Sequence, residues 1–189
     1  MPFEYGLYEL TLIFLFWGVT GWMIEVIDMR IEAGEFQNRG FLHMPLCPIY
    51  GAGMAAGTVV LSGVRNSFLI LFFFGVVFCS VLEYIVGGIL ERLFHSKWWD
   101  YSHMRFNIKG RVCLRNAVLF GFGAIVVFHF VQPVVEDIIV LIPVGIRMGI
   151  SAIFGIAFAI DLVISARRAL AYRKNHEGGE PRLLFKAHR

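Results

Sequence analysis

The stretch NSFLILFFFGVVFCSVL, residues 66–82, decides the class of fold, because it is an unbroken run of uncharged and mostly apolar residues. A helix needs roughly 20 predominantly apolar residues to cross the hydrocarbon core of a bilayer, and this run is close to that length. Further uncharged runs occur at residues 10–24, 44–64, 116–135 and 148–160. Together the runs predict an all-α membrane protein with five transmembrane helices.

The composition of the whole chain supports a membrane location. Of 189 residues, 58% are hydrophobic and only 16% are charged, and the mean hydropathy is +0.70. A soluble domain carries more charge than this. Residues 133–143, which contain Glu136 and Asp137, are too short and too acidic for a span, so we expect a surface or interfacial segment there.

The predicted helices take their limits from the apolar runs. They cover residues 5–27, 48–64, 67–94, 115–131 and 145–166. Glu25 and Asp161 shorten the first and last runs, so we expect both carboxylates inside the membrane. The helices form one transmembrane domain, residues 1–166, and a basic cytoplasmic tail follows at residues 167–189.

The distribution of Lys and Arg predicts the orientation in the membrane. With the N-terminus outside and the C-terminus inside, only Arg65 and Arg147 of the 17 basic residues lie in outer segments. Cytoplasmic loops carry the excess of basic residues in membrane proteins. No basic region precedes the first apolar run, so we interpret that run as an uncleaved anchor. These features predict a multi-pass protein of the bacterial cytoplasmic (inner) membrane.

Two polar segments then face the cytoplasm, and they are similar to each other. The sequence NRGFLHMPLCPIYG covers residues 38–51, and WWDYSHMRFNIKGRVCLRN covers residues 98–116. Each segment has an Asn and Gly pair, an Arg beside that Gly and a Cys near the start of the next helix. A parallel repeat of two helical hairpins and chance similarity explain this equally well. We expect Trp98, Trp99 and Tyr101 to form an aromatic belt at the inner headgroup level.

The predicted helix at residues 67–94 carries a stripe that we expect to face protein. Small residues and carboxylates recur along it every four residues, at Gly75, Cys79, Glu83, Gly87 and Glu91. A carboxylate that faces lipid costs at least ~2.5 kcal/mol, whereas small residues allow helices to approach closely. We therefore expect the stripe to pack against the first predicted helix around Glu25. Gly53 and Gly57 give the second predicted helix a similar close-packing face.

Two roles remain open for such buried carboxylates. Each one either fixes helix packing through a hydrogen bond or ion pair, or serves as a ligand for a proton, an ion or a substrate. Several of them converge with Arg39 and Arg111 toward the inner side, which favours an inward-facing polar cavity. The two arginines either hold a phosphate or carboxylate near a helix N-terminus, or contact lipid headgroups or pair with Glu25 and Glu91. The candidate substrate-binding residues are Glu25, Asn38, Arg39, Glu83, Glu91, Asp100, Asn107, Arg111 and Asn116.

Several kinds of chemistry are not expected. No CxxC or HExxH pattern indicates a metal site, and no feature indicates a cofactor or a nucleic-acid partner. No GxxxxGK[ST] pattern occurs, so the chain is not itself a P-loop ATPase. Cys47, Cys79 and Cys113 lie near the inner half or the core, where disulfides are not expected, so we interpret them as packing thiols.

Four blocks of the sequence carry a resemblance to a known family. The blocks are GWMIEVI, NRGFLHMPLCPIYG, LEYIVGGILERLFHSKWWDYS and FNIKGRVCLRNAVLFG, which together cover about residues 21–121. In this order they resemble the bacterial membrane family called ABC-transporter type IV, or CmpB-like. The resemblance implies a helical multispan inner-membrane protein with a transporter attribution. It marks motif positions, among them Tyr50, Trp99 and Tyr101, without giving any of them a role.

These observations lead to two main hypotheses. The first is a permease-like or substrate-binding membrane component of a transporter, with a polar site built from the two cytoplasmic loops and the intramembrane carboxylates. The alternative is a small membrane-embedded enzyme acting on a lipid or phosphate-bearing headgroup, with a Glu as base and Arg39 or Arg111 holding the phosphate. A third hypothesis is a structural partner of a larger complex. Membrane lipids are expected partners, and a separate ATPase, another membrane subunit and a second copy of the chain are left open.

Overall fold

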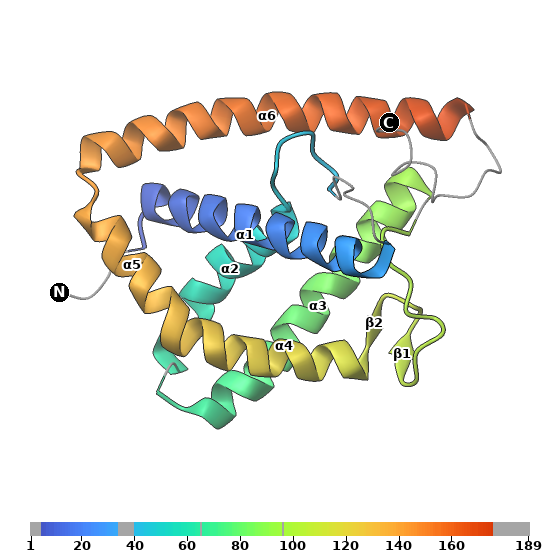
Figure 1. The fold of residues 1–189 in the computed structure, drawn as a ribbon, viewed down its shortest axis with the longest axis horizontal. Coiled ribbons are helices and arrows are strands. Elements are labelled where there is room, and N and C mark those ends of the chain that lie inside the picture. Colours follow the sequence, from blue (N-terminus) through green and yellow to red (C-terminus); the bar gives the residue numbers. More distant parts are fainter. Residues whose placement is uncertain (1–4, 34–39, 65, 96, 176–189) are drawn as a thin grey trace.

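The computed structural model describes residues 5–33, 40–64, 66–95 and 97–175, and this part of the chain is almost entirely helical. Four helices are long and apolar enough to cross a membrane (Figure 1). They are α1 (Leu7–Ala33), α3 (Phe68–Phe94), the continuous run of α4, η2 and α5 (Leu114–Leu141), and α6 (Val144–Asn175). The all-helical architecture predicted from the sequence is therefore confirmed.

The second predicted helix is shorter than expected. α2 covers Pro48–Leu61 and is followed by the 3-10 turn η1 (Ser62–Val64). Its 14 residues rise about 21 Å, which is less than the roughly 30 Å of hydrocarbon in a bilayer. Pro48 suits the first position of this helix, because the N–H that proline lacks would have no helical partner there. α2 alone is therefore too short to cross the membrane.

Residues 40–47, which precede α2, are not helical, yet they lie against the middle of α1. The backbone N–H of Cys47 donates a hydrogen bond to the carbonyl oxygen of Gly18 at 2.9 Å. The Leu46 side chain fills the space that a side chain at Gly18 would need. Further along α2, Met54 packs against the apolar cluster at the start of α1. The chain therefore enters the bundle in a non-helical form and continues as α2 toward the N-terminal end of α1.

The chain from α4 to α5 forms one long helical run, which corrects the expectation of a surface segment at residues 133–143. Its parts are α4 (Leu114–Val126), the π-helical segment η2 (Val127–Val131) and α5 (Gln132–Leu141). The π-helical segment and the adjacent Pro133 coincide with a bend (Figure 1). Glu136 is only 6% exposed, and its Oε1 accepts a hydrogen bond from Gln132 Nε2 at 3.1 Å. A carboxylate that faces protein in this way does not prevent a span.

α3 packs mainly against α4, and a small residue makes the approach close. A Cβ added at Gly75 would come within 2.5 Å of the Cβ of Ala124. Gly53 of α2 lies similarly close to Leu82 of α3. The predicted stripe on α3 does pack against protein, but Gly75 faces α4 rather than α1. The partner helix predicted from the sequence is therefore wrong at that position.

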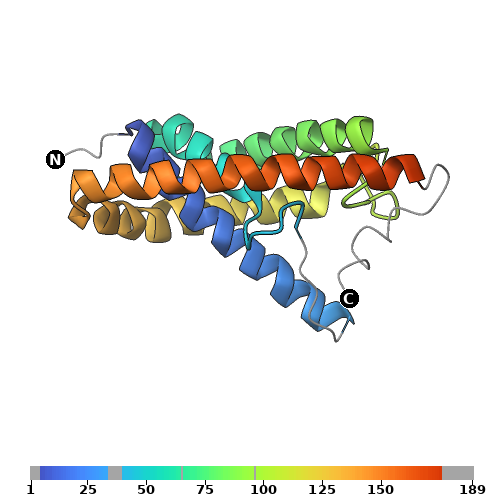
Figure 2. The same cartoon turned by 90° about the horizontal axis from the view of Figure 1, so that it is seen from above.

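Helix ends and loops gather at two opposite ends of the bundle. α1, α3 and α6 begin toward one end of the bundle (Figure 1). At that end Arg147 of α6 forms an ion pair with Glu9 of α1. The opposite end holds the loop after α3, which contains the short antiparallel strands β1 (Asn107–Ile108) and β2 (Val112–Cys113). α6 extends along one side to Asn175, and the C-terminal half of α1 diverges from it (Figure 2).

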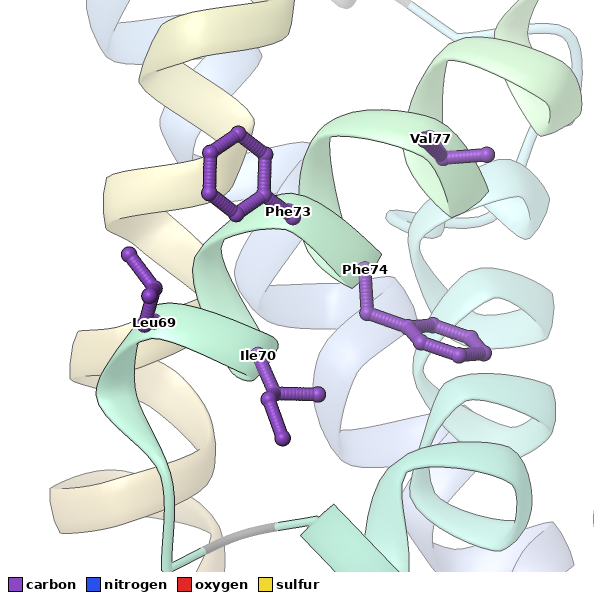
Figure 3. A pocket seen from close by; sticks show the side chains of 5 residues that line it. All are labelled: Leu69, Ile70, Phe73, Phe74 and Val77. Atoms are coloured by element: carbon purple, nitrogen blue, oxygen red, sulfur yellow. The ribbon is translucent and has the colours of Figure 1, made fainter.

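An open hollow of about 440 Å³ lies on the outer face of α3 (Figure 3). Its lining consists of Leu69, Ile70, Phe73, Phe74 and Val77. A ligand site normally adds a few polar groups to such an apolar lining, and this one has none among its lining residues. We therefore expect this face to contact the acyl chains of the bilayer.

Candidate functional site

Five polar side chains from different parts of the fold meet between the helices, and we call them the inner polar cluster. Its members are Glu25 of α1, Tyr50 of α2, Glu83 of α3, Tyr101 of the loop after α3, and Asn116 of α4. Tyr50 Oη donates to Glu25 Oε1 at 2.9 Å. Tyr101 Oη donates to Glu83 Oε1 at 3.0 Å, and Asn116 also hydrogen-bonds to Tyr101. The carboxylates of Glu25 and Glu83 interact electrostatically, and so do the phenols of Tyr50 and Tyr101. These interactions link the two hydrogen-bonded pairs into one cluster.

The absence of a side chain at Gly21 allows Tyr50 to reach Glu25. The Tyr50 ring lies directly against Gly21, and a Cβ at that position would overlap the ring. Gly21 and Glu25 are four residues apart, so they share one face of α1. The segment GWMIE therefore supplies both the space for the phenol and its hydrogen-bond acceptor.

Tyr101 turns inward from its loop instead of joining an aromatic belt at the interface. Its backbone N–H donates to the carbonyl oxygen of Gly110 at 2.8 Å, which fixes the start of the loop against the β-hairpin. Burial raises the pKa of the Tyr101 phenol, and the nearby Glu83 carboxylate raises it further. The phenol therefore keeps its proton and acts as a donor to Glu83.

Glu83 is the most enclosed carboxylate of the inner polar cluster. It is 6% exposed, and among the described residues only the Tyr101 hydroxyl donates to it, at Oε1. Among the described residues, no donor contacts Glu83 Oε2, which is itself buried. A buried polar atom without a partner costs roughly 1–3 kcal/mol, and more when it is charged. Such an atom in a native fold calls for an explanation, which is a bound water, a bound ion, strain or a functional role.

Arg111 does not belong to the inner polar cluster, because it already forms an ion pair with Glu91. Its Nε and Nη2 donate to Oε2 of Glu91 at 2.9 and 2.7 Å, and its guanidinium lies 5.2 Å from the centroid of the Tyr84 ring. These hydrogen bonds to Glu91 raise the pKa of Arg111 above its ordinary value. Gly87 and Gly88 leave the room on α3 that this arrangement needs. The pair joins the loop to the last turns of α3.

Asp100 and Asn107 organise the loop itself. Asp100 Oδ1 accepts hydrogen bonds from the hydroxyl and the backbone N–H of Ser102, and these bonds lower the pKa of Asp100. Asn107 Nδ2 donates to the carbonyl oxygen of Met104 at 2.8 Å, and Asn107 Oδ1 accepts the N–H of Gly110 at 3.0 Å. Both side chains are therefore used to hold the loop in its shape.

Asp161 of α6 holds the non-helical segment 40–47 in place. Its Oδ2 accepts the backbone N–H of Met44 at 2.9 Å, and its Oδ1 lies 2.9 Å from Nδ1 of His43. Asp161 lies inside the candidate span Val144–Ala171, as expected from the sequence. A carboxylate on α6 thus stabilises irregular backbone within the bundle.

The Ser165, His43 and Asp161 side chains meet, but their geometry is not that of a nucleophilic triad. Arg168 Nη1 lies 2.7 Å from Nε2 of His43, and because a guanidinium only donates, Nε2 accepts and Nδ1 carries the hydrogen. Ser165 Oγ and the Asp161 carboxylate both contact that same Nδ1. In a triad the hydroxyl and the carboxylate use different ring nitrogens. These contacts therefore hold α6 against the non-helical segment 40–47, and their geometry does not activate Ser165 as a nucleophile.

The comparisons with known proteins place the chain in a family. The family model described as "Putative ABC-transporter type IV" matches residues 12–166, a range that contains the whole inner polar cluster. The chain belongs to the ABC-transporter type IV family. No curated protein and no solved structure matches it.

Within this member of the ABC-transporter type IV family, the predicted site residues separate into groups. The inner polar cluster brings together Glu25, Glu83 and Asn116. Asp100, Asn107 and the Glu91–Arg111 pair lie in or beside the loop after α3. Asn38 and Arg39 lie outside the described residues, so the predicted joint site of the two loops stays a prediction.

The remaining expectations concern metal ligands and cysteines. Within the part of the chain that the structure describes, no group of three or more His, Cys, Asp or Glu side chains is placed to hold a metal ion. Cys47, Cys79 and Cys113 are not joined in disulfides in the described part of the chain.

Two tyrosines of the site are absent from the candidate residues predicted from the sequence. The sequence marks Tyr50 only as a family motif position and assigns Tyr101 to an aromatic belt, although each phenol lies beside a predicted carboxylate. Their spacing gives no signal, because Tyr50 is 25 residues from Glu25 and Tyr101 is 18 residues from Glu83. The only available hint was that an intramembrane carboxylate needs a donor. The nearest phenols in the adjoining loops could have been proposed on that ground.

Proposed function

We propose that the chain is the membrane component of a transporter, permease-like or substrate-binding, and that the inner polar cluster forms the centre of an inward-facing polar site. Membership of the ABC-transporter type IV family supports the transport role. The observation that carries the site is the buried Glu83 carboxylate, which lies close enough to Glu25 for electrostatic interaction. Side chains of α1, α2, α3 and α4 converge at this point.

In this proposal residues 40–61 form a fifth crossing, made of a non-helical half and the half-length helix α2. Non-helical backbone at membrane depth is tolerated only where it is buried in protein or lines a water-filled cavity. Interrupted helices of this kind form the substrate and ion sites of many transporters. The hydrogen bond from Cys47 to the middle of α1 and the position of Tyr50 in the first turn of α2 support this assignment.

Five crossings put the two termini on opposite sides, and we propose that the N-terminus lies outside and the C-terminus lies in the cytoplasm, with the chain in the inner membrane of a bacterial cell. The end of the bundle that holds the loop after α3 is then cytoplasmic. Its basic residues include Lys97, Arg105, Lys109, Arg111 and Arg115. The positive-inside rule supports this orientation. Tyr101 consequently reaches the inner polar cluster from the cytoplasmic side.

Energy for transport in an ABC system comes from an ATPase, and the chain has no P-loop sequence. We therefore propose a separate ATPase subunit that docks at the cytoplasmic end. The alternative of a headgroup-modifying enzyme gains no support from the described residues. Arg111, one of the two arginines proposed to hold a phosphate, is bound to Glu91 instead.

Copurification from the bacterial host tests this function. The full chain, tagged at its C-terminus and extracted in mild detergent, is expected to retain a stoichiometric P-loop ATPase and to hydrolyse ATP. Glu83→Gln is expected to keep that partner but lower hydrolysis by roughly tenfold, the effect of about 1.4 kcal/mol on an activation barrier. Leu69→Ala, on the lipid-facing side of α3, serves as the control and leaves hydrolysis unchanged. A preparation without any P-loop protein overturns the ATPase assignment.

A further inference from the structure

The two carboxylates of the inner polar cluster differ in how their oxygens are satisfied. Glu25 is half-buried and accepts a hydrogen bond from Tyr50, and it has further interactions. Glu83 is buried, and its Oε2 contacts no donor among the described residues. Among the described residues, the one donor to Glu83 is the phenol of Tyr101, which is neutral and does not balance the carboxylate charge. Within this part of the chain, Glu83 therefore has one oxygen without a donor and a buried charge that no cation balances.

We propose that the inner polar cluster is a proton-binding site, in which Glu83 takes up one proton on Oε2 while Glu25 remains charged. This inference rests on the proposed transport function and adds a coupling ligand to it. Two carboxylates that interact at close range do not ionise equally, because the charge of one disfavours the charge of the other. Glu83, which is the less exposed carboxylate and has an oxygen without a donor among the described residues, takes the proton first.

The proton balance of the site is simple. On uptake, the proton adds to Glu83 Oε2, and the carboxylate becomes a neutral acid whose new O–H is a donor. Tyr101 keeps its own proton and continues to donate to Oε1. On release, the proton returns to water, and Glu83 is again an anion. No oxidant, reductant or second substrate is needed.

The groups around Glu83 favour a proton over a larger ligand. They are Glu25 from α1, Tyr50 from α2, Cys79 from α3, Tyr101 from the loop and Asn116 from α4. Multivalent metals require several ligands, and no metal-binding group of acids, thiols and imidazoles occurs among the described residues. A proton needs only one free oxygen and no cavity of its own.

Infrared difference spectroscopy of the full chain in lipid nanodiscs tests the proposal without a substrate or a partner. The wild type is expected to show a carboxylic-acid C=O band that appears as the pH is lowered and has its midpoint at or below about pH 9, the upper value documented for buried glutamates. Glu83→Gln is expected to lose this band. Glu91→Gln keeps it, because Glu91 lies two turns away on α3 and is already paired with Arg111. A band that persists unchanged in Glu83→Gln, or its absence from the wild type, overturns the proposal.

Two further variants keep Glu83 and so remain informative if Glu83→Gln does not fold. Tyr101→Phe removes a hydrogen bond to the charged form, so the midpoint of the band is expected to rise by about one pH unit. Glu25→Gln removes a neighbouring negative charge, so the midpoint is expected to fall by about one pH unit. Shifts in the same direction, or no shift in either variant, contradict the site. A titrating Glu83 without a copurified ATPase overturns only the ATPase assignment, and the reverse result overturns only the proton site.

Discussion

At the scale of residues, two carboxylates of α3 are satisfied in different ways, and only one of them, Glu83, is buried. Glu91 is held by the guanidinium of Arg111, which balances its charge. Glu83 is held by the phenol of Tyr101, which supplies a hydrogen bond but no charge. An ion pair of the first kind fixes the loop to α3 and leaves little reason for either partner to change protonation. The second arrangement leaves a charge that only a cation can neutralise, which is why the functional assignment rests on Glu83.

The hydrogen bonds around Asp100 predict a stability difference that depends on pH. The pKa of Asp100 is lowered in the folded chain, so its charged form stabilises the loop above the unfolded value of about 3.9, and this contribution is lost as pH falls through the lowered folded pKa. Asp100→Asn is expected to reduce the melting temperature modestly at pH 7, because the side chain is half exposed. Thermal denaturation of both proteins at pH 7 and in acid measures this. A difference that grows on acidification would contradict the assignment.

The sequence alone identifies the carboxylates of the site, but it does not identify the side chains that hydrogen-bond to them. Glu25 and Glu83 could be predicted because a charge in an apolar run must find a polar partner within the bundle. The identity of that partner depends on how loops fold back between helices, as with Tyr101 and the Asp161–His43 contact across 118 residues. Neither helical periodicity nor residue spacing records such contacts.

At the scale of elements, the contact between α3 and α4 depends on Gly75. The Cβ that alanine would add meets the Cβ of Ala124, which can move only with its backbone. Gly75→Ala is therefore expected to destabilise the chain by ~1–3 kcal/mol, as overpacking does. Gly123→Ala in α4 is the matched control, because no atom lies within 4 Å of its added Cβ and alanine favours a helix by up to ~1 kcal/mol. Thermal denaturation in detergent compares them, and equal stabilities would refute the predicted close contact.

Apolar patterning in the sequence predicts some helices of the fold correctly and others not. The run at residues 66–82 marks α3 correctly, because a span of suitable length needs only apolar side chains. Patterning fails at α5, where Glu136 is accommodated by Gln132 and the helix continues. The predicted start of the second helix at residue 48 is correct, but patterning does not reveal that residues 40–47 pack within the bundle, with Asp161 accepting the backbone N–H groups of His43 and Met44. Tertiary hydrogen bonds decide both cases.

At the scale of the whole molecule, the arrangement of ends links the fold to its proposed function. The loop after α3 and the end of α6 lie at one end of the bundle, and the connection from α5 to α6 lies at the other (Figure 1). If the first end is cytoplasmic, protons and an ATPase both approach the inner polar cluster from the side where Tyr101 enters. The orientation of the chain therefore determines which compartment exchanges protons with Glu83.

Cysteine labelling in intact cells measures that orientation directly. In a background in which Cys47, Cys79 and Cys113 are replaced by Ala, a membrane-impermeant maleimide is expected to label Pro143→Cys, because residue 143 lies exposed between α5 and α6 at the outer end. His103→Cys, exposed in the loop after α3, is expected to react only after the cells are opened. Both variants must label fully in opened cells, which controls for accessibility. Labelling of His103→Cys alone in intact cells inverts the topology, and the inner polar cluster would then open to the outside of the cell.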